Sequence, residues 1–217
     1  MFKLWRKLPI VTLPSWPTLA VAAGAVVLLA LLGTGAWMWN AAQHRRAAAA
    51  YAETLLKVRA VENPQATAQD RTAALGDLER VLAEHPTSTM APQAAYVLGN
   101  LRFASGQYDR ARAAYQLTVA RSGAGTIATL ARAGMGYAWE AERKLPEATQ
   151  AFETALADLK PAAFYYEELL ADLARTQEQS GKKDAAIATY RRMLKDRPLS
   201  VRAPEVRSRL GSLGATP

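Results

Sequence analysis

The feature that most constrains this chain is a run of 21 residues without charge, LAVAAGAVVLLALLGTGAWMW, at positions 19–39. An α-helix rises about 1.5 Å per residue, so the run spans about 31 Å, close to a bilayer's hydrocarbon core of about 30 Å. Trp16 precedes the run and Trp37 and Trp39 close it, where an aromatic belt would meet the lipid headgroups. Because a soluble core helix rarely needs a surface that is apolar all round, the run favours a membrane anchor over a buried helix.

The main alternative to an anchor is a cleaved signal peptide. A signal peptide's apolar region is only about 7–15 residues long and ends at small residues, whereas this run is longer and ends at Trp37-Met38-Trp39. We therefore predict an uncleaved transmembrane helix at 18–40, after a basic tail at 1–17. Basic residues are nearly balanced across the run, but a short basic tail before a large domain favours a cytoplasmic amino end and an external domain.

The rest of the chain has room for one further domain. It carries all 19 acidic and 24 of the 27 basic residues, so its excess of positive charge is mild and spread along the sequence. A nucleic-acid interface would instead gather basic residues on one face beside stacking aromatics or a known motif, and none is evident. The chain has no cysteine, which excludes disulfides, thiolate metal sites and lipid attachment at an N-terminal cysteine.

The second part of the sequence repeats itself. Three stretches, 106–119, 143–156 and 181–194, each begin at a polar turn and continue with an alanine and, four residues later, an aromatic residue. These pairs are Ala111/Tyr115, Ala148/Phe152 and Ala186/Tyr190, with the alanines 37 and 38 residues apart. A small residue lets two antiparallel helices approach closely, and the aromatic fills the space before the next pair, so neighbouring pairs must stack. We predict a linker helix at 41–66, helical repeats at 67–200, and a capping helix and tail at 201–217.

This pattern resembles the tetratricopeptide repeat (TPR). The residues that fit the TPR signature in order and spacing are Leu98, Gly99, Gly106, Tyr108, Ala111 and Tyr115, then Met135, Gly136, Ala148, Phe152 and Ala155, then Gly181, Ala186, Tyr190 and Pro198. The period exceeds the family's 34 residues and the first-helix tryptophan is missing; longer connections between repeats can absorb the extra residues. The resemblance implies an all-α fold, with one N-terminal transmembrane helix followed by a TPR-like α-solenoid of three to four helix pairs.

No pattern in the sequence indicates catalysis or a cofactor. His44 and His85 are far apart, without the further ligands at set spacing that a metal site needs. Adjacent Glu167 and Glu168 point in different directions on a helix and do not form an acid–base pair. Gly134-Met135-Gly136 does not complete a phosphate-binding loop, and close helix packing is the expected role of these glycines. We expect no enzyme, cofactor, metal, nucleic acid or small-molecule substrate.

A protein-binding surface is the remaining candidate site. The resemblance implies that the first helix of each pair lines a groove that binds proteins or peptides. By helical spacing, the predicted groove residues are Tyr96, Asn100, Phe103, Tyr137, Glu140 and Arg175. TPR domains that grip a terminal carboxylate use lysines with asparagines on this face; this sequence lacks the lysines, so that mode is not expected.

The layout of basic tail, membrane helix and repeats resembles the family of ancillary subunits of the bacterial Sec translocon and the related cell-division coordinators. The resemblance implies a single-pass inner-membrane protein with a periplasmic TPR-like domain. It would act as a chaperone-like factor for exported chains at the translocon. Two alternatives stay open: a scaffold for envelope assembly, in cell division, cell-wall synthesis or cytochrome c maturation, and an accessory subunit of a membrane enzyme complex.

Overall fold

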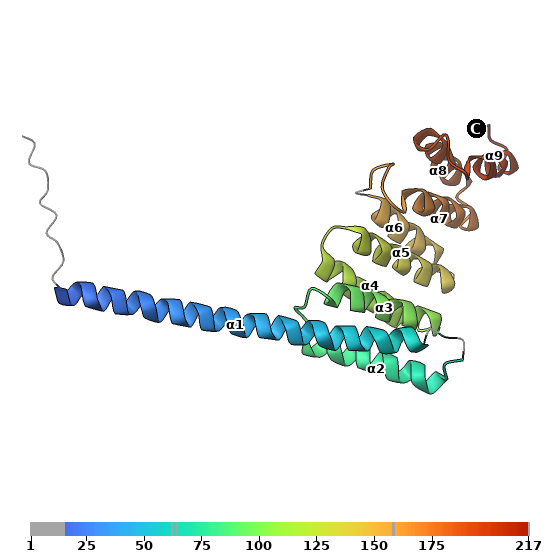
Figure 1. The fold of residues 1–217 in the computed structure, drawn as a ribbon. Helices are drawn as coiled ribbons and strands as arrows, with labels where there is room; N and C mark the ends of the chain where they lie inside the picture. Colours follow the sequence, from blue (N-terminus) through green and yellow to red (C-terminus); the bar gives the residue numbers. More distant parts are fainter. Residues whose placement is uncertain (1–15, 62, 64, 158, 217) are drawn as a thin grey trace, which may run out of the picture. The chain divides into compact units, whose positions relative to one another are not determined.

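The computed structural model describes residues 16–61, 63, 65–157 and 159–216. Over these residues the chain forms nine helices (Figure 1). Their bounds are α1 Trp16–Val61, α2 Ala68–Glu84, α3 Ala91–Ala104, α4 Tyr108–Ser122, α5 Thr126–Ala141, α6 Leu145–Leu156, α7 Tyr166–Gln179, α8 Lys183–Asp196 and α9 Ala203–Ser212. The chain divides into two compact units, Met1–Arg46 and Ala47–Pro217, here the N-terminal unit and the repeat unit. All but two residues of the predicted tail lie outside the described residues.

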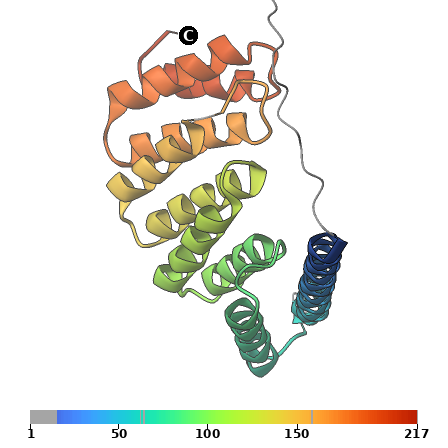
Figure 2. The same cartoon turned by 90° about the vertical axis from the view of Figure 1, so that its left-hand side faces the viewer.

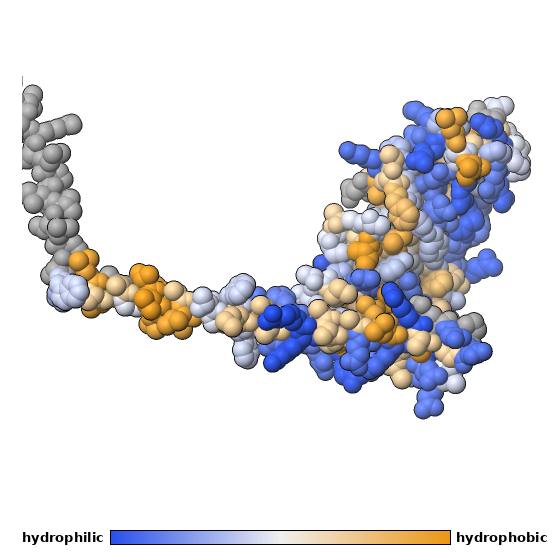
Figure 3. Space-filling model, viewed as in Figure 1, coloured by the Kyte–Doolittle hydropathy of each residue, from blue (hydrophilic) through white to orange (hydrophobic). Residues whose placement is uncertain are grey.

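Helix α1 belongs to both units. In the N-terminal unit it exposes large apolar side chains; Leu29 is 68% and Leu31 65% exposed, and hydrophobic residues gather along this part of the helix (Figure 3). Among the described residues, α1 is the one helix long and apolar enough to cross a membrane, judged by length and composition. The predicted membrane helix and linker helix form one continuous helix, which ends just before Asn63-Pro64, because the residue before a proline avoids the helical region.

The repeat unit is a stack of antiparallel helix pairs (Figure 2). Residues 47–61 of α1 share a buried core with α2, and the following pairs are α3 with α4, α5 with α6, and α7 with α8. Helix α9 packs on α8 after the last pair. The all-helical repeat fold predicted from the sequence is therefore confirmed, with four pairs over the described residues.

In each of the last three pairs, the turn between the two helices has one residue in the left-handed backbone conformation, at the same position of the turn. Gly106, Arg143 and Gly181 have φ angles of 71°, 62° and 72°, and they follow one another at intervals of 37 and 38 residues. In each turn the amide of the next residue donates a hydrogen bond to a carbonyl of the preceding helix, as Lys144 N does to Trp139 O at 2.9 Å. Glycine adopts this conformation freely, whereas arginine does not, so the middle turn is the strained one.

The buried side chains of the repeat unit form three clusters. The N-terminal core joins α1 to α2, α3 and α4 around Tyr51, Val58 and Leu78. The middle core consists of Ala111, Tyr115 and Ala131. The C-terminal core contains residues of all five helices from α5 through α9. Its fully or almost fully buried members include Phe152, Tyr166, Leu169, Leu170, Met193 and Leu210. Burying one such large apolar side chain contributes about 1.5–3 kcal/mol, so these clusters hold the pairs together.

Candidate protein-binding face

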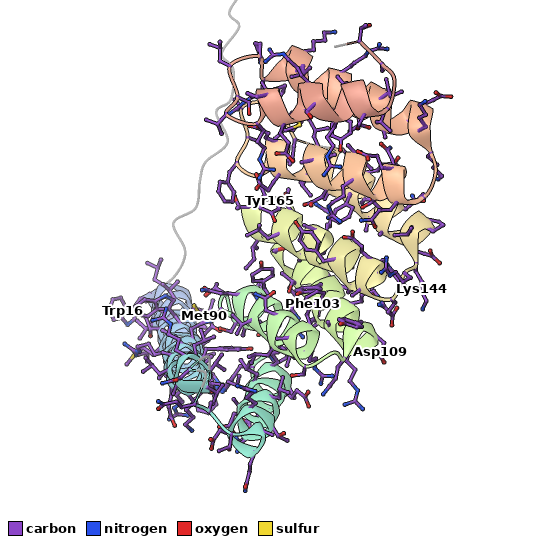
Figure 4. The ribbon with its side chains drawn as sticks, turned by 90° about the vertical axis from the view of Figure 1, so that its right-hand side faces the viewer. Trp16, Met90, Phe103, Asp109, Lys144 and Tyr165 are labelled. Atoms are coloured by element: carbon purple, nitrogen blue, oxygen red, sulfur yellow. The ribbon has the colours of Figure 1, made fainter. Side chains whose placement is uncertain are left out.

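The first helices of successive pairs, α3, α5 and α7, contribute neighbouring stripes to one face of the repeat unit, here called the first-helix face. Tyr96, Asn100 and Phe103 are spaced by four and three residues, which places them on one side of α3. Tyr137 and Glu140 are three residues apart and lie on one side of α5, which contacts α3. Arg175 of α7 pairs with Glu140. The structure thus brings all six predicted groove residues to this face. Of these, Phe103 is labelled in Figure 4.

Two of the predicted residues on α3, Tyr96 and Phe103, pack against aromatic rings of α4. The ring centroid of Tyr96 lies 5.9 Å from that of Tyr115, and the ring centroid of Phe103 lies 5.4 Å from that of Tyr108. Asn100 is exposed, and its Oδ1 accepts a hydrogen bond of 2.9 Å from the Tyr115 hydroxyl. Because Oδ1 of Asn100 accepts this bond, the amide nitrogen is the part of the side chain that is left to donate at the surface.

A hydrogen-bonded tyrosine pair links α5 to α7. The Tyr137 hydroxyl donates to Oδ2 of Asp172 and lies 2.8 Å from the hydroxyl of Tyr165. Tyr165 precedes α7 in the left-handed conformation, with φ 69°, and is labelled in Figure 4. Burial, followed by the hydrogen bond to Asp172, raises the pKa of Tyr137 far above its usual value. Tyr137 is therefore a neutral donor at every physiological pH.

Charged side chains on the same face form ion pairs with one another. The guanidinium of Arg175 pairs with Glu140 and, at 2.8 Å, with Oδ1 of Asp172. Burial alone would lower the pKa of Arg175, but the hydrogen bonds to Glu140 and Asp172 outweigh it and raise the pKa. The Arg175–Glu140 pair and the hydrogen bond from Tyr137 to Asp172 both join α7 to α5 across the face.

Two hollows lie along this face. The first, of about 580 Å³, is open and is lined by Phe103, Tyr137, Glu140, Ala141, Arg143 and Gln179. The second, of about 290 Å³, lies among α7, α8 and α9; its lining includes Asp172, Arg175, Gln179, Tyr190, Arg202 and Arg209. Gln179 lines both, so the two hollows are neighbours.

The predicted packing residues lie beneath this face. Ala111, Ala148 and Ala186 are completely buried, and Phe152 is too. A Cβ added to Gly99 of α3 would lie 2.5 Å from the Tyr115 ring, and one added to Gly134 of α5 would lie 2.6 Å from it. The Tyr115 ring therefore lies between the first helix of its own pair and that of the next. The corresponding last aromatic, Tyr190, donates from its hydroxyl to Glu178 at 2.5 Å.

Three residues of the face were not predicted: Gln179, which lines both hollows, Tyr165 and Asp172. Tyr165 reaches Tyr137 only because of its left-handed turn, for which the sequence gives no glycine or asparagine signal. Asp172 lies three residues before Arg175, and this helical i, i+3 spacing of opposite charges was a readable signal.

The chemistry of the face suits polypeptide binding. It offers aromatic rings, exposed amides at Asn100 and Gln179, and the exposed guanidinium of Arg143. Aromatic residues and arginine are enriched in protein interfaces. Among the described residues no group of three or more His, Cys, Asp or Glu side chains is arranged to hold a metal ion.

Comparison with known families assigns the fold. The model of the tetratricopeptide repeat-like domain matches residues 14–215, nearly the whole chain. The chain belongs to this family. TPR-like repeat proteins mediate protein–protein interactions, and the fold is typically a scaffold without enzymatic activity. The comparison with curated proteins found no match.

Solved structures show the same TPR-like fold at low identity. The MamA protein is 18% identical over 72% of this chain and 78% of its own, with a TM-score of 0.55. A kinesin light chain from Podospora anserina with TPR-like repeats is 14% identical over 80% of this chain and 88% of its own, with a TM-score of 0.52. BtubC from P. vanneervenii is 18% identical over 67% of this chain and 63% of its own, with a TM-score of 0.51. At these identities the likeness shows the fold alone.

Proposed function

We propose that this TPR-like protein is a membrane-tethered module that binds extended polypeptide segments on its first-helix face. The observation that carries the proposal is the open hollow lined by Phe103, Tyr137, Glu140 and Gln179. It places two aromatic rings beside an exposed amide, so that a bound segment can bury apolar side chains and keep backbone hydrogen bonds.

The aromatic and amide groups favour a binder with broad sequence tolerance. Glu140 and Asp172 share the guanidinium of Arg175, and exposed Arg143 lines the open hollow beside them, so the face carries charges of both signs. A surface of rings, amides and mixed charges discriminates weakly between sequences, because specificity needs contacts that penalise the wrong partner. This supports a chaperone-like role toward varied chains.

The tether and the cellular setting complete the proposal. The uncharged run at 19–39 and the exposed apolar side chains of α1 support a helix that spans the bacterial inner membrane. We place the repeat unit in the periplasm, where it would bind newly exported chains beside the Sec translocon. A tether raises the effective concentration of a weak binder near its partner, so the affinity for each segment can stay low.

Site-specific photocrosslinking in cells that express the full chain tests this role. A photoreactive amino acid replaces Gln179 or Asn100 on the face and, as matched control, exposed Glu153 on α6. We expect adducts with many exported precursors from the two face positions and few from position 153. Equal adducts from all three positions would contradict the assignment of the face. Adducts with one folded protein would favour the envelope-scaffold alternative.

Variants and a topology assay complement the crosslinks. Replacing Tyr96 and Phe103 together with alanine should weaken capture while most helicity remains, and Gln179→Ala should weaken it without loss of stability, because Gln179 is exposed. A C-terminal fusion to an enzyme active only outside the cytoplasm should be active. Fluorescence from a cytoplasm-only fusion instead would refute the periplasmic placement and leave a cytoplasmic scaffold.

A further inference from the structure

One edge of the repeat unit is formed by the connections that lead from the second helix of a pair to the first helix of the next. These connections, at 85–90, 123–125, 157–165 and 197–202, are here called the connecting edge. Two hydrogen bonds show how neighbouring elements meet there. The Tyr51 hydroxyl of α1 donates to His85 O at 3.0 Å, and Arg197 Nη1 donates to Pro161 O at 2.9 Å.

The connecting edge concentrates the exposed apolar side chains of the repeat unit. Phe164 is 69%, Leu199 97% and Val201 96% exposed. Among the described residues of this unit, Leu56 is the one other large hydrophobic side chain that is exposed. Isolated hydrophobic residues are also visible over the α8–α9 end in the space-filling view (Figure 3). The two connections that carry these three residues are neighbours, joined by the hydrogen bond from Arg197 to Pro161, so they form one candidate patch.

The two connections are held in place, so their apolar side chains point outward from a fixed base. Ser200 Oγ donates to Glu167, and Arg202 pairs with Glu168. Arg197 lies 3.9 Å from Glu167, so both acidic side chains beside the patch have an arginine partner. Lys160 is exposed and makes no ion pair within the described part of the chain.

The opposite edge has a different character. It consists of the turns inside the pairs, such as Ser105–Gln107, Glu142–Lys144 and Ser180–Lys182, which are built from small and polar residues. No large exposed hydrophobic residue lies in these three turns, all of which the structure describes. Apart from Leu56 of α1, the exposed large apolar side chains among the described residues of this unit therefore lie on the connecting edge.

The path of the chain identifies the partner. The segment 47–61 of α1 enters the repeat unit at the connecting edge, because Tyr51, near its start, bonds to His85 in the first connection. Only eight residue steps separate Trp39, the last residue of the apolar run, from Ala47. Even fully extended they cover at most about 29 Å. If the run spans a membrane, the chain length therefore keeps Ala47, the first residue of the repeat unit, within about 29 Å of the end of the run.

We propose that the connecting edge rests on the bilayer, with Phe164, Leu199 and Val201 in its interfacial layer. This inference depends on the tether of the proposed function and is independent of peptide binding. Aromatic and aliphatic side chains on loop tips bury apolar area at the headgroup boundary, and the amphipathic interface tolerates their polar neighbours. Such contact would hold the first-helix face at a fixed height above the membrane.

The test uses the full chain in liposomes, because the absence of cysteine allows single-site labelling. An environment-sensitive fluorophore is attached to Pro198→Cys, which leaves Leu199 and Val201 intact. The matched control is Lys182→Cys on the opposite edge, and Leu29→Cys reports insertion of the apolar run. We expect a lipid-borne quencher to quench the label at 198 at least two-fold more than the label at 182, and Leu199→Asp with Val201→Asp to abolish the difference.

The outcomes separate this inference from the tether. Strong quenching at 29 with equal, weak quenching at 198 and 182 overturns the membrane contact and leaves the tether standing. Loss of quenching at 29 refutes the tether and, with it, this proposal. A label at 198 that is shielded from soluble iodide but not quenched from the lipid shows that a second copy of the chain covers the edge, which also overturns the proposal.

Discussion

Replacing Gly136 with alanine sets two effects of a single methyl group against each other. Gly136 is buried in α5, and an added Cβ would lie 2.6 Å from Cε1 and 2.8 Å from Cδ1 of Phe152. Phe152 is completely buried, so its ring has no space into which to move. Alanine favours the helix over glycine by about 0.8–1.0 kcal/mol, whereas overpacking a tight core costs about 1–3 kcal/mol. We expect a net loss of up to about 2 kcal/mol.

Gly76→Ala provides the matched control. Gly76 lies inside α2 and is exposed, and nothing approaches an added Cβ within 4 Å. This variant should gain the full helix term of about 0.8–1.0 kcal/mol. The two variants should therefore differ by the overpacking term of about 1–3 kcal/mol. For a chain of this size that corresponds to about 2–12 °C in Tm.

The assay is urea and thermal unfolding of the full chain in detergent, followed by far-UV circular dichroism. The unfolding slopes of both variants should match the parent, so that midpoints can be compared. In a Phe152→Leu background the penalty of Gly136→Ala should shrink, because the clashing ring atoms are gone and neighbouring changes are coupled. If Gly136→Ala stabilised the chain as much as Gly76→Ala, the inference that the Phe152 ring leaves no room for a side chain at position 136 would be refuted.

Three further outcomes are expected. Ala148→Leu should lower stability by about 1–3 kcal/mol in the same melts, because Ala148 is fully buried and the added volume overpacks the pair. Arg143→Gly should raise stability by up to about 1 kcal/mol in urea, because relief of the left-handed strain outweighs glycine's chain entropy; a loss would contradict that strain. Burial raises the pKa of Tyr137 above the ordinary 10.0. Above that pH the unfolded chain releases a proton that the folded chain keeps, so stability should fall as pH rises, less steeply in Tyr137→Phe.

The repeat fold could be predicted because its packing depends on residues that are close together in the sequence. Ala111 and Tyr115 are one helical turn apart, and the same pair recurs at 148/152 and 186/190. A small residue beside a large one specifies where two helices approach, whatever the rest of the helix contains. The all-helical TPR-like fold is confirmed by the structure and by the family match. The choice of groove residues stays a prediction, although the structure places them on one face.

The contacts across the face could not be read from the sequence. The hydrogen bond from Tyr137 to Asp172 joins residues 35 positions apart, and its existence depends on the offset between neighbouring pairs. That offset follows from the connection 157–165, where Tyr165 adopts a conformation that no local residue signal indicates. The cation–π contact of Arg112 with Trp139, at 3.6 Å from the ring centroid, likewise joins two different pairs.

The uneven division of the buried core affects how this protein can deform. The middle core has three buried members, Ala111, Tyr115 and Ala131, against eleven in the N-terminal and fifteen in the C-terminal core. In stacked repeats, cooperativity passes only through nearest-neighbour interfaces, so the small middle core, where Tyr115 packs closely against Gly99 and Gly134, carries the coupling between the two larger cores. A ligand lying from Phe103 to Gln179 would contact α3, α5 and α7 and add to that coupling. We therefore expect client binding to slow amide hydrogen exchange in α4 and α5, including positions that the client does not touch.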